Sequence, residues 1–170
     1  MGEFPFDPAI YVFHLSVAIG RLRDAQLERE LRPVGINLAK YRALTVILRF
    51  DACTMTELAE YSAVDRTTLT RTIDQLVKDA LVRRGAKPQD RRQVVLTLTT
   101  AGRRVAAAAR DTISRHNRRV LEGVPDEQVR GMVRTQKMIA ANLVGDRAML
   151  ERLLTLQPPA DAEPRPPSTR

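Results

Sequence analysis

Cysteine, histidine and tryptophan are scarce in this chain. Among its 170 residues there are one cysteine, two histidines and no tryptophan. The single cysteine, Cys53, cannot form an internal disulfide, which fits a reducing compartment. His14 and His116 are far apart in the sequence and far from Cys53, so the clustered ligands that a metal sensor needs are missing. We therefore expect neither a disulfide nor a metal site.

Long apolar runs and glycine-rich phosphate loops are missing too. The longest uncharged stretch near the start, residues 8–20, is too short to span a bilayer, and no basic residue precedes it as in a signal peptide. No serine or cysteine is spaced to act as a nucleophile with a histidine, and no glycine-rich loop is present to hold a nucleotide. These absences predict a cytoplasmic protein that is not an enzyme and holds no cofactor.

Positive charge is abundant, and it is concentrated in one segment. The formal net charge of the chain is +8. Between Arg66 and Arg92, eight basic residues stand against three acidic ones, so this segment alone carries a net charge of +5. A local basic excess attracts phosphate polyanions. A merely solvated surface is also charged, but the arginine content of this segment favours double-stranded DNA as its partner.

Start signals and apolar spacing predict four helices in the first half of the chain. Pro8, with Asp7 as its cap, starts the first helix, and Thr54 with Glu57 forms a capping box for the third. An aspartate caps the fourth. The helices are expected at about residues 8–31 and 38–50, from residue 54, and from residue 65.

The fourth helix has two chemically different faces. Its apolar face consists of Leu69, Thr72, Ile73 and Leu76. Its polar face consists of Arg66, Thr67, Thr70, Arg71 and Asp74. A helix that presents short polar and basic side chains can enter a DNA major groove, and the positive end of the helix dipole favours phosphate. Ordinary solvent-exposed faces have a similar composition, so the polar face alone does not identify a DNA-binding helix.

Two strands are predicted after the fourth helix, at Val82–Arg84 and Val94–Leu98. We expect residues 85–93 between them to form a long charged loop, which contains Pro88. Long charged loops are more often functional than short ones, and a flexible arginine tip can reach the DNA backbone or minor groove. The order of these elements is that of a helix-turn-helix followed by a β-wing.

Long apolar helices are predicted at both ends of the chain. A fifth helix is expected at about residues 101–123, capped by Thr99 or Thr100, and a sixth begins at Pro125. An apolar stripe continues to Leu154 after a break at Gly145. One small domain cannot easily bury these helices, so we expect them to be buried in a two-fold homodimer. Such a dimer would present two recognition helices about one DNA turn apart, which suits a palindromic site.

The predicted fold is mainly α with a small β-wing. Residues 36–99 are expected to form a winged helix-turn-helix DNA-binding domain. Residues 8–35 and 100–156 are expected to form a helical dimerisation region. Proline, alanine and charged residues dominate residues 157–170, which predicts a disordered tail.

These elements resemble the MarR family of bacterial winged-helix regulators. The matching stretches are residues 54–59 (TMTELA), 64–71 (VDRTTLTR), 81–84 (LVRR) and 90–102 (DRRQVVLTLTTAG). The last stretch is the most specific, because it fits the D-x-R wing of the family followed by its LT-x-x-G helix start. The resemblance covers roughly residues 8–145.

The resemblance implies a dimeric transcription regulator, usually a repressor, that binds a palindromic operator. Its recognition helix would contact the major groove through Thr67, Thr68, Thr70 and Arg71, with Arg66 close by. Its wing would place Arg92 in the minor groove, with Arg91 and Lys87 on phosphates. Asp90 would pair with an arginine and stiffen the wing, while Arg83 and Arg84 would contact phosphates or support the fold.

One residue departs from the pattern of the family. The family usually has a glycine after the recognition helix, where the chain needs a left-handed residue, and this chain has Ala80. Alanine at positive φ costs about 1 kcal/mol. Either the turn takes another shape here, or the protein loses some stability.

Many members of the resembled family release DNA when a small phenolic or anionic molecule binds between the dimer helices and the DNA-binding part. Candidate residues for such a cleft are Tyr11, His14, Arg21, Tyr41 and Arg42. Tyrosines on apolar faces, such as Tyr11 and Tyr41, are more often plain core residues, and a histidine such as His14 is more often a core or interface residue than a sensor. His116 has arginines around it in the fifth helix, which suggests a solvated or phosphate-facing position.

Other functions remain open at this point. The chain could be an architectural DNA-binding protein without an effector, and a filled cleft beside the first helix would favour that alternative. A protein-interaction module is a third possibility, although it would have no need of Arg71, Arg91 and Arg92. Oxidant sensing is disfavoured, because the first helix has no cysteine and Cys53 suits a hydrophobic staple before Thr54.

Overall fold

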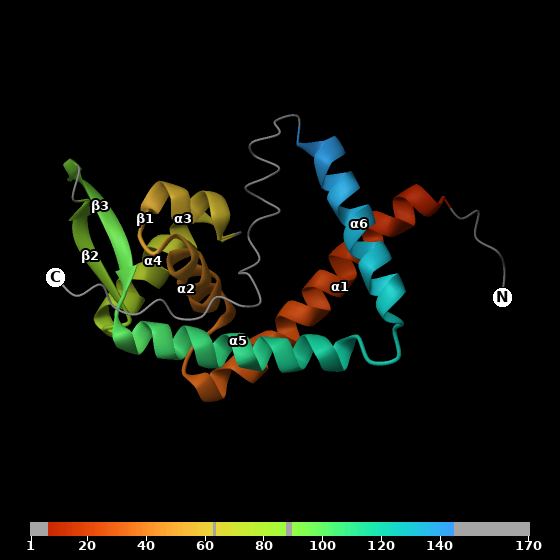
Figure 1. The fold of residues 1–170 in the computed structure, drawn as a ribbon, viewed down its shortest axis with the longest axis horizontal. Helices are drawn as coiled ribbons and strands as arrows, with labels where there is room; N and C mark the ends of the chain where they lie inside the picture. The colour runs from red at the N-terminus through yellow and green to blue at the C-terminus, as the bar shows by residue number, and fades with distance from the viewer. Residues whose placement is uncertain (1–6, 63, 88–89, 145–170) are drawn as a thin grey trace.

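The fold is mainly helical with a small antiparallel sheet, as predicted (Figure 1). The computed structural model describes residues 7–62, 64–87 and 90–144. The helices in this part are α1 (Pro8–Leu31), α2 (Leu38–Phe50), α3 (Met55–Tyr61), α4 (Arg66–Lys78), α5 (Thr100–Val120) and α6 (Asp126–Leu143), with a 3-10 turn at Arg32–Val34. The strands are β1 (Cys53–Thr54), β2 (Val82–Lys87) and β3 (Asp90–Leu98).

The predicted helix starts are confirmed by their caps. The side chain of Asp7 accepts a hydrogen bond from the backbone of Ala9 at the start of α1. At α3, Thr54 and Glu57 form both hydrogen bonds of a capping box. Thr99 caps α5 through a 2.9 Å hydrogen bond from the Gly102 backbone. Capping hydrogen bonds between residues close in sequence therefore set where these helices begin, independently of tertiary packing.

The sheet differs from the prediction in two ways. First, Cys53 and Thr54 form a third strand, β1, which pairs with β3 opposite Leu96 and Val95. Second, residues 85–87 and 90–93 belong to the strands, so the long loop expected at residues 85–93 is wrong. The hairpin is paired from Val82 opposite Leu98 up to its tip, with an irregularity after residue 86. Because β2 and β3 are paired along this length, the wing is a two-stranded β-ribbon and not a long loop.

The hydrophobic core joins the C-terminal end of α1 to α2, α3, α4, the sheet and α5. Its largest fully buried apolar side chains are Leu27, Leu31, Leu44, Ile47, Leu58, Leu69, Ile73, Leu76, Leu96, Val82 and Cys53. The apolar face predicted for α4 lies in this core, because Leu69, Ile73 and Leu76 are all fully buried. The opposite face of α4 is thereby directed outward.

Residues 8–22 of α1 and the whole of α6 contribute nothing to this core among the described residues. Most of their large apolar side chains are exposed, with 66% of Leu22 and 72% of Leu143 accessible. In Figure 1 these two segments lie at the end of the molecule opposite α3, α4 and the hairpin. No helix in the described part of the chain is both long enough and apolar enough to cross a membrane.

Ala80 adopts the left-handed conformation that the sequence put in question. Its φ is 56°. The backbone of Ala80 donates to Val77, and that of Leu81 donates to Leu76, which is the hydrogen-bond pattern of a helix end with a left-handed residue. The Thr99 hydroxyl donates to the Ala80 carbonyl at 2.8 Å, so the turn also supports the cap of α5.

Replacing Ala80 with glycine will therefore stabilise the protein. We expect the free energy of unfolding to rise by about 1 kcal/mol, because glycine takes a positive φ without the steric cost that alanine bears. Chemical denaturation of the wild type and the variant shows whether the free energy of unfolding rises or falls. The matched control is Ala108→Gly on the exposed side of α5, which should lower stability by about 1 kcal/mol. A loss of stability in both variants would contradict the strain assigned to Ala80.

Candidate nucleic-acid interface

The polar face of α4 starts at a helix end whose cap is well defined. The Asp65 carboxylate accepts a 2.9 Å hydrogen bond from the Thr68 backbone. Hydrogen bonding by Thr68, through its side chain and its backbone, holds the pKa of this carboxyl below its usual range. The carboxylate thus stays ionised on the cap at neutral pH and fixes where the exposed face begins.

Arg66, Thr67, Thr68, Thr70 and Arg71 are all exposed on α4. The Thr70 hydroxyl donates to the Arg66 carbonyl at 3.0 Å, which orients it along the helix and leaves its lone pairs outward. None of the ion pairs among the described residues involves Arg66 or Arg71. The predicted major-groove residues therefore share one accessible surface with two uncompensated guanidinium groups.

The hairpin lies beside α4 and adds to this surface (Figure 1). Arg83 and Arg84 on β2 are exposed, and Arg84 forms an ion pair with Asp74 of α4 at 2.5 Å. Lys87 ends β2, and Arg91 and Arg92 lie near the start of β3. The side chains of these three residues are outside the described part of the structure. Their strand positions nevertheless place three basic residues near the tip of the hairpin.

A cavity of about 710 Å³ lies between α1, α2, α5 and the start of α6. Four arginines line it, namely Arg23, Arg42, Arg110 and Arg118. Tyr41, Tyr61 and Ser62 contribute polar groups, and one acidic residue, Asp126, is present at its edge. A pocket with this lining suits a ligand that has both an aromatic part and a negative charge.

The arginines of the cavity differ in how they are held. Arg23 donates twice to the Asn117 side chain, at 3.1 and 3.2 Å, and Arg42 pairs with Asp24 at 2.8 Å. Arg110 and Arg118 take part in none of the ion pairs in the described ranges. The site thus offers two fixed guanidinium groups and two that an anion can engage.

A buried hydroxyl adds to the binding potential of the cavity. Ser62 is 3% exposed, and its Oγ has no hydrogen-bond partner within the part of the chain that the structure describes. A buried polar atom without a partner is costly, so a ligand that bonded Ser62 would recover that cost.

The predicted ligand residues fall into two groups in the structure. Tyr41 and Arg42 line the cavity. Tyr11, His14 and Arg21 are exposed along α1 and do not line it, although the rings of Tyr11 and His14 stack at 6.2 Å. Sequence reasoning missed the contributions of α5, which are Arg110, Ile113, Ser114, Asn117 and Arg118. The signal was available, because these residues recur at helical spacing on one face.

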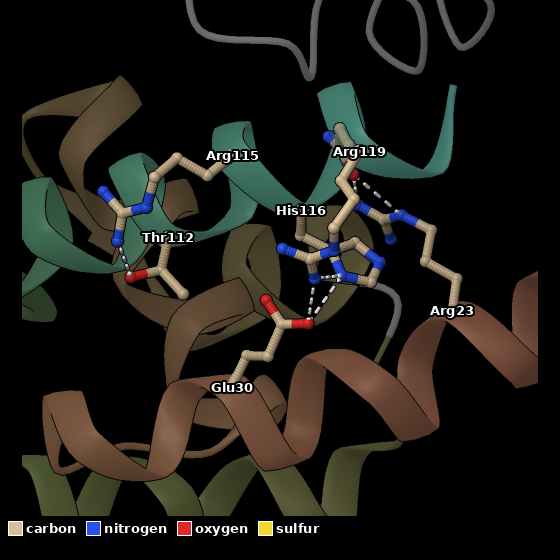
Figure 2. A network of polar contacts seen from close by, with 7 residues as sticks. Arg23, Glu30, Thr112, Arg115, His116 and Arg119 are labelled. Atoms are coloured by element: carbon tan, nitrogen blue, oxygen red, sulfur yellow. Dashed lines mark hydrogen bonds and ion pairs between the residues drawn. The ribbon is translucent and has the colours of Figure 1, made fainter. Parts of the chain in front are cut away.

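His116 is fully buried, so the solvated or phosphate-facing position expected for it is wrong. Figure 2 shows its ring between α5 and α1, where its Nδ1 lies 3.0 Å from the Glu30 carboxylate. Arg119 also donates to Glu30. The hydrogen bond with His116, followed by the charge of Arg119, holds the pKa of Glu30 below its usual range. This network joins α1 to α5 beside the cavity.

Replacing Glu30 with glutamine will lower stability in a pH-dependent way. A carboxyl whose pKa is lowered on folding contributes stability above its unfolded pKa, about 4.5, and loses it as pH falls through the lower folded value. The difference in unfolding free energy between the wild type and Glu30→Gln should therefore be largest near neutral pH and shrink below pH 4.5. Denaturation at several pH values checks this. Glu122→Gln, which removes an exposed carboxylate outside the network, is the control; an equal pH trend there would contradict the assignment.

Known proteins share this sequence pattern. The profile of the MarR family matches residues 36–94. The multiple antibiotic resistance protein MarR of Escherichia coli (strain K12) is 36% identical over 99 residues, which cover 54% of this chain and 68% of that protein.

Solved structures share the fold as well. A mutant of E. coli MarR complexed with operator DNA superposes with a TM-score of 0.69 at 25% identity, covering 81% of this chain and 99% of that one. CouR from Rhodococcus jostii RHA1 bound to p-coumaroyl-CoA superposes with a TM-score of 0.68 at 25% identity, covering 75% of this chain and 90% of that one.

Proposed function

The chain belongs to the MarR family of transcription regulators, and we propose that it is a homodimeric repressor that binds a palindromic DNA operator. The observation that carries this proposal is the outward face of α4, where Arg66 and Arg71 lie among exposed threonines beside a basic hairpin and form no ion pair with another described residue. The E. coli relative bound to operator DNA supports it. A protein that binds a chromosomal operator must reach the chromosome, so we propose a cytoplasmic location.

Two parts of the surface would read the operator differently. The exposed face of α4 would contact base edges in the major groove through Thr67, Thr68, Thr70 and Arg71. Arg66 would lie near the phosphates at the start of the helix. The tip of the hairpin would carry Lys87, Arg91 and Arg92 to the neighbouring minor groove and its phosphates. The winged helix-turn-helix unit proposed for these contacts is residues 36–99.

The exposed apolar surface of α1 and α6 supports the homodimer. Large apolar side chains are exposed on both helices in the described part of the chain, including Ile10, Phe13, Val17, Ile19, Leu22, Met132, Met138 and Leu143. A patch of this kind marks an interface, and a two-fold axis lets the same surface serve both copies. We assign residues 8–35 and 100–156 to this dimerisation region.

The cavity supports release of DNA by a small aromatic or anionic ligand. Its open volume and its arginines favour this proposal over a DNA-binding protein without an effector, for which a filled cleft is expected. The neighbour CouR is described with p-coumaroyl-CoA bound. Because the cavity is lined by α2 and α5, which also pack around the DNA-binding core, a ligand there could change the spacing of the two recognition helices.

Replacing Arg71 with alanine tests the recognition assignment. If Arg71 reads a base, its loss should relax sequence preference by about 1–3 kcal/mol at one base-pair position and leave the others unchanged. Binding of the variant to an operator and to its single-base-pair substitutions, measured in moderate salt, checks this.

The control is Arg130→Ala, which removes the same charge from α6 at the other end of the molecule (Figure 1). It should leave operator preference unchanged. A uniform loss of affinity on all sequences for Arg71→Ala would make Arg71 a phosphate contact, and an unchanged affinity would contradict the placement of α4 in the groove.

A further inference from the structure

One acidic side chain lies on the face of α4 proposed to contact DNA. Asp74 follows Arg71 by three residues and Thr67 by seven, so it shares their face. Its carboxylate is 2.5 Å from the Arg84 guanidinium on β2, and both side chains are about half exposed, at 55% and 44%. This ion pair links the recognition helix to the wing.

Arg84 differs in this from its basic neighbours. Arg66, Arg71 and Arg83 are exposed, and no ion pair within the described residues involves any of them. Arg84 extends from the same side of β2 as the buried Val82, two residues away, which directs it toward α4. Of the four arginines on this surface whose side chains the structure describes, Arg84 alone is held by a carboxylate.

Stability does not explain the pair well. An exposed ion pair contributes between 0 and about 1 kcal/mol to folding. Its effect on DNA binding is larger in principle, because a phosphate competes with the carboxylate for the same guanidinium. If Arg84 leaves Asp74 for a phosphate, the freed carboxylate faces the same backbone and repels it, so the pair as a whole neutralises no phosphate.

We propose that Asp74 is a specificity-determining residue, which keeps Arg84 from DNA phosphates and braces the wing against α4. This inference rests on the proposed function. Phosphate contacts strengthen binding to every sequence alike, so withholding one lowers affinity for unrelated DNA. The ion pair between Asp74 and Arg84 also favours the operator complex, because the recognition helix and the wing must contact the DNA at the same time.

The test is Asp74→Asn in the full chain. Asparagine has nearly the same size but no charge, so Arg84 becomes available to a phosphate. Affinity for unrelated DNA should rise about three- to tenfold at low salt, and the slope of log affinity against log salt should steepen by about 0.9, the value for one added phosphate contact. Operator affinity should rise less, so the ratio of the two affinities should fall at least about threefold.

Two further variants separate this effect from a change in total charge. Asp79→Asn also removes a carboxylate from the end of α4, but its partner is Lys40, at 2.7 Å, and it lies five residues from Asp74 on another side of the helix. It should leave the salt slope and the affinity ratio near the wild-type values. Adding Arg84→Gln to Asp74→Asn should abolish the steeper slope, because the freed guanidinium is gone.

The outcomes distinguish the inference from the function on which it rests. A wild-type protein that binds neither its operator nor unrelated DNA overturns the proposed function itself. A wild type that binds, with equal effects of Asp74→Asn and Asp79→Asn, overturns the role of Asp74 alone. Weaker binding of Asp74→Asn to every DNA, with unchanged thermal stability, overturns it as well. The predicted slope and ratio, lost again in the double variant, support it.

Discussion

Replacing Gly102 with alanine will destabilise the protein by about 3 kcal/mol or more. A Cβ atom at this position would lie 2.0 Å from the carbonyl oxygen of Leu81 and 3.0 Å from its carbon. These are backbone atoms, and the same carbonyl accepts a hydrogen bond from the Thr99 backbone at 3.0 Å. Any shift that relieved the clash would weaken the cap of α5, so the cost should reach the upper end of the range for overpacking.

Chemical denaturation measures this loss, which would be a large share of the stability of a typical domain. Gly131→Ala is the matched control, since Gly131 is also helical and an added Cβ would make only an ordinary contact with Arg134. That variant should be neutral or slightly more stable, because alanine favours a helix. Equal stability of the two variants would contradict the close approach of α5 to Leu81.

Replacing Arg92 with alanine will reduce operator affinity roughly 10- to 100-fold, which corresponds to about 1.4–2.8 kcal/mol. The physical reason is the loss of a guanidinium from the wing, where a narrow minor groove concentrates negative potential. Binding isotherms on the operator check the magnitude. Sedimentation should still give the mass of a dimer, because Arg92 lies on the hairpin and the proposed interface lies on α1 and α6.

Arg92→Lys separates charge from shape in this prediction. Lysine keeps the positive charge but lacks the planar fork of arginine, so it should retain the salt dependence and recover only part of the affinity. Wild-type affinity in Arg92→Ala would contradict the assignment of the wing to DNA.

The helices could be predicted from the sequence because their start signals are local. Asp7, Thr54 and Thr99 each cap the helix that they were expected to cap, through hydrogen bonds within a few residues. The turn at Ala80 was predicted in part. The sequence indicated that a left-handed residue is needed there, but it left open whether the turn takes another shape or alanine adopts a positive φ at a cost in stability. In the structure Ala80 adopts a positive φ, so the steric cost falls on its backbone conformation.

Features that depend on distant residues could not be predicted in this way. Strand β1 exists because Cys53 and Thr54 meet β3, more than forty positions along the chain, and two residues alone carry no strand pattern. His116 was misplaced because its arginine neighbours in sequence suggested solvent, whereas Glu30 on α1 receives its ring. The ion pair between Asp74 and Arg84 likewise could not be predicted, because it depends on how α4 and β2 are oriented relative to each other.

The candidate DNA surface was more predictable than the cavity. The residues of α4 follow one helical period, so their common face can be read from spacing. The cavity collects side chains from α1, α2, α5 and α6, and only Tyr41 and Arg42 among the expected residues line it. Such a site depends on how helices cross, which no single periodicity encodes.

The most direct test of the proposed function is the binding of the purified protein to the DNA that flanks its own gene, compared with unrelated DNA of equal length, in moderate salt and with a panel of small aromatic acids. We predict selective binding to a palindromic site in the flanking DNA, relieved by at least one acid. Binding without selectivity, falling steeply with salt and unaffected by every acid, would contradict a ligand-responsive repressor and favour an architectural DNA-binding protein.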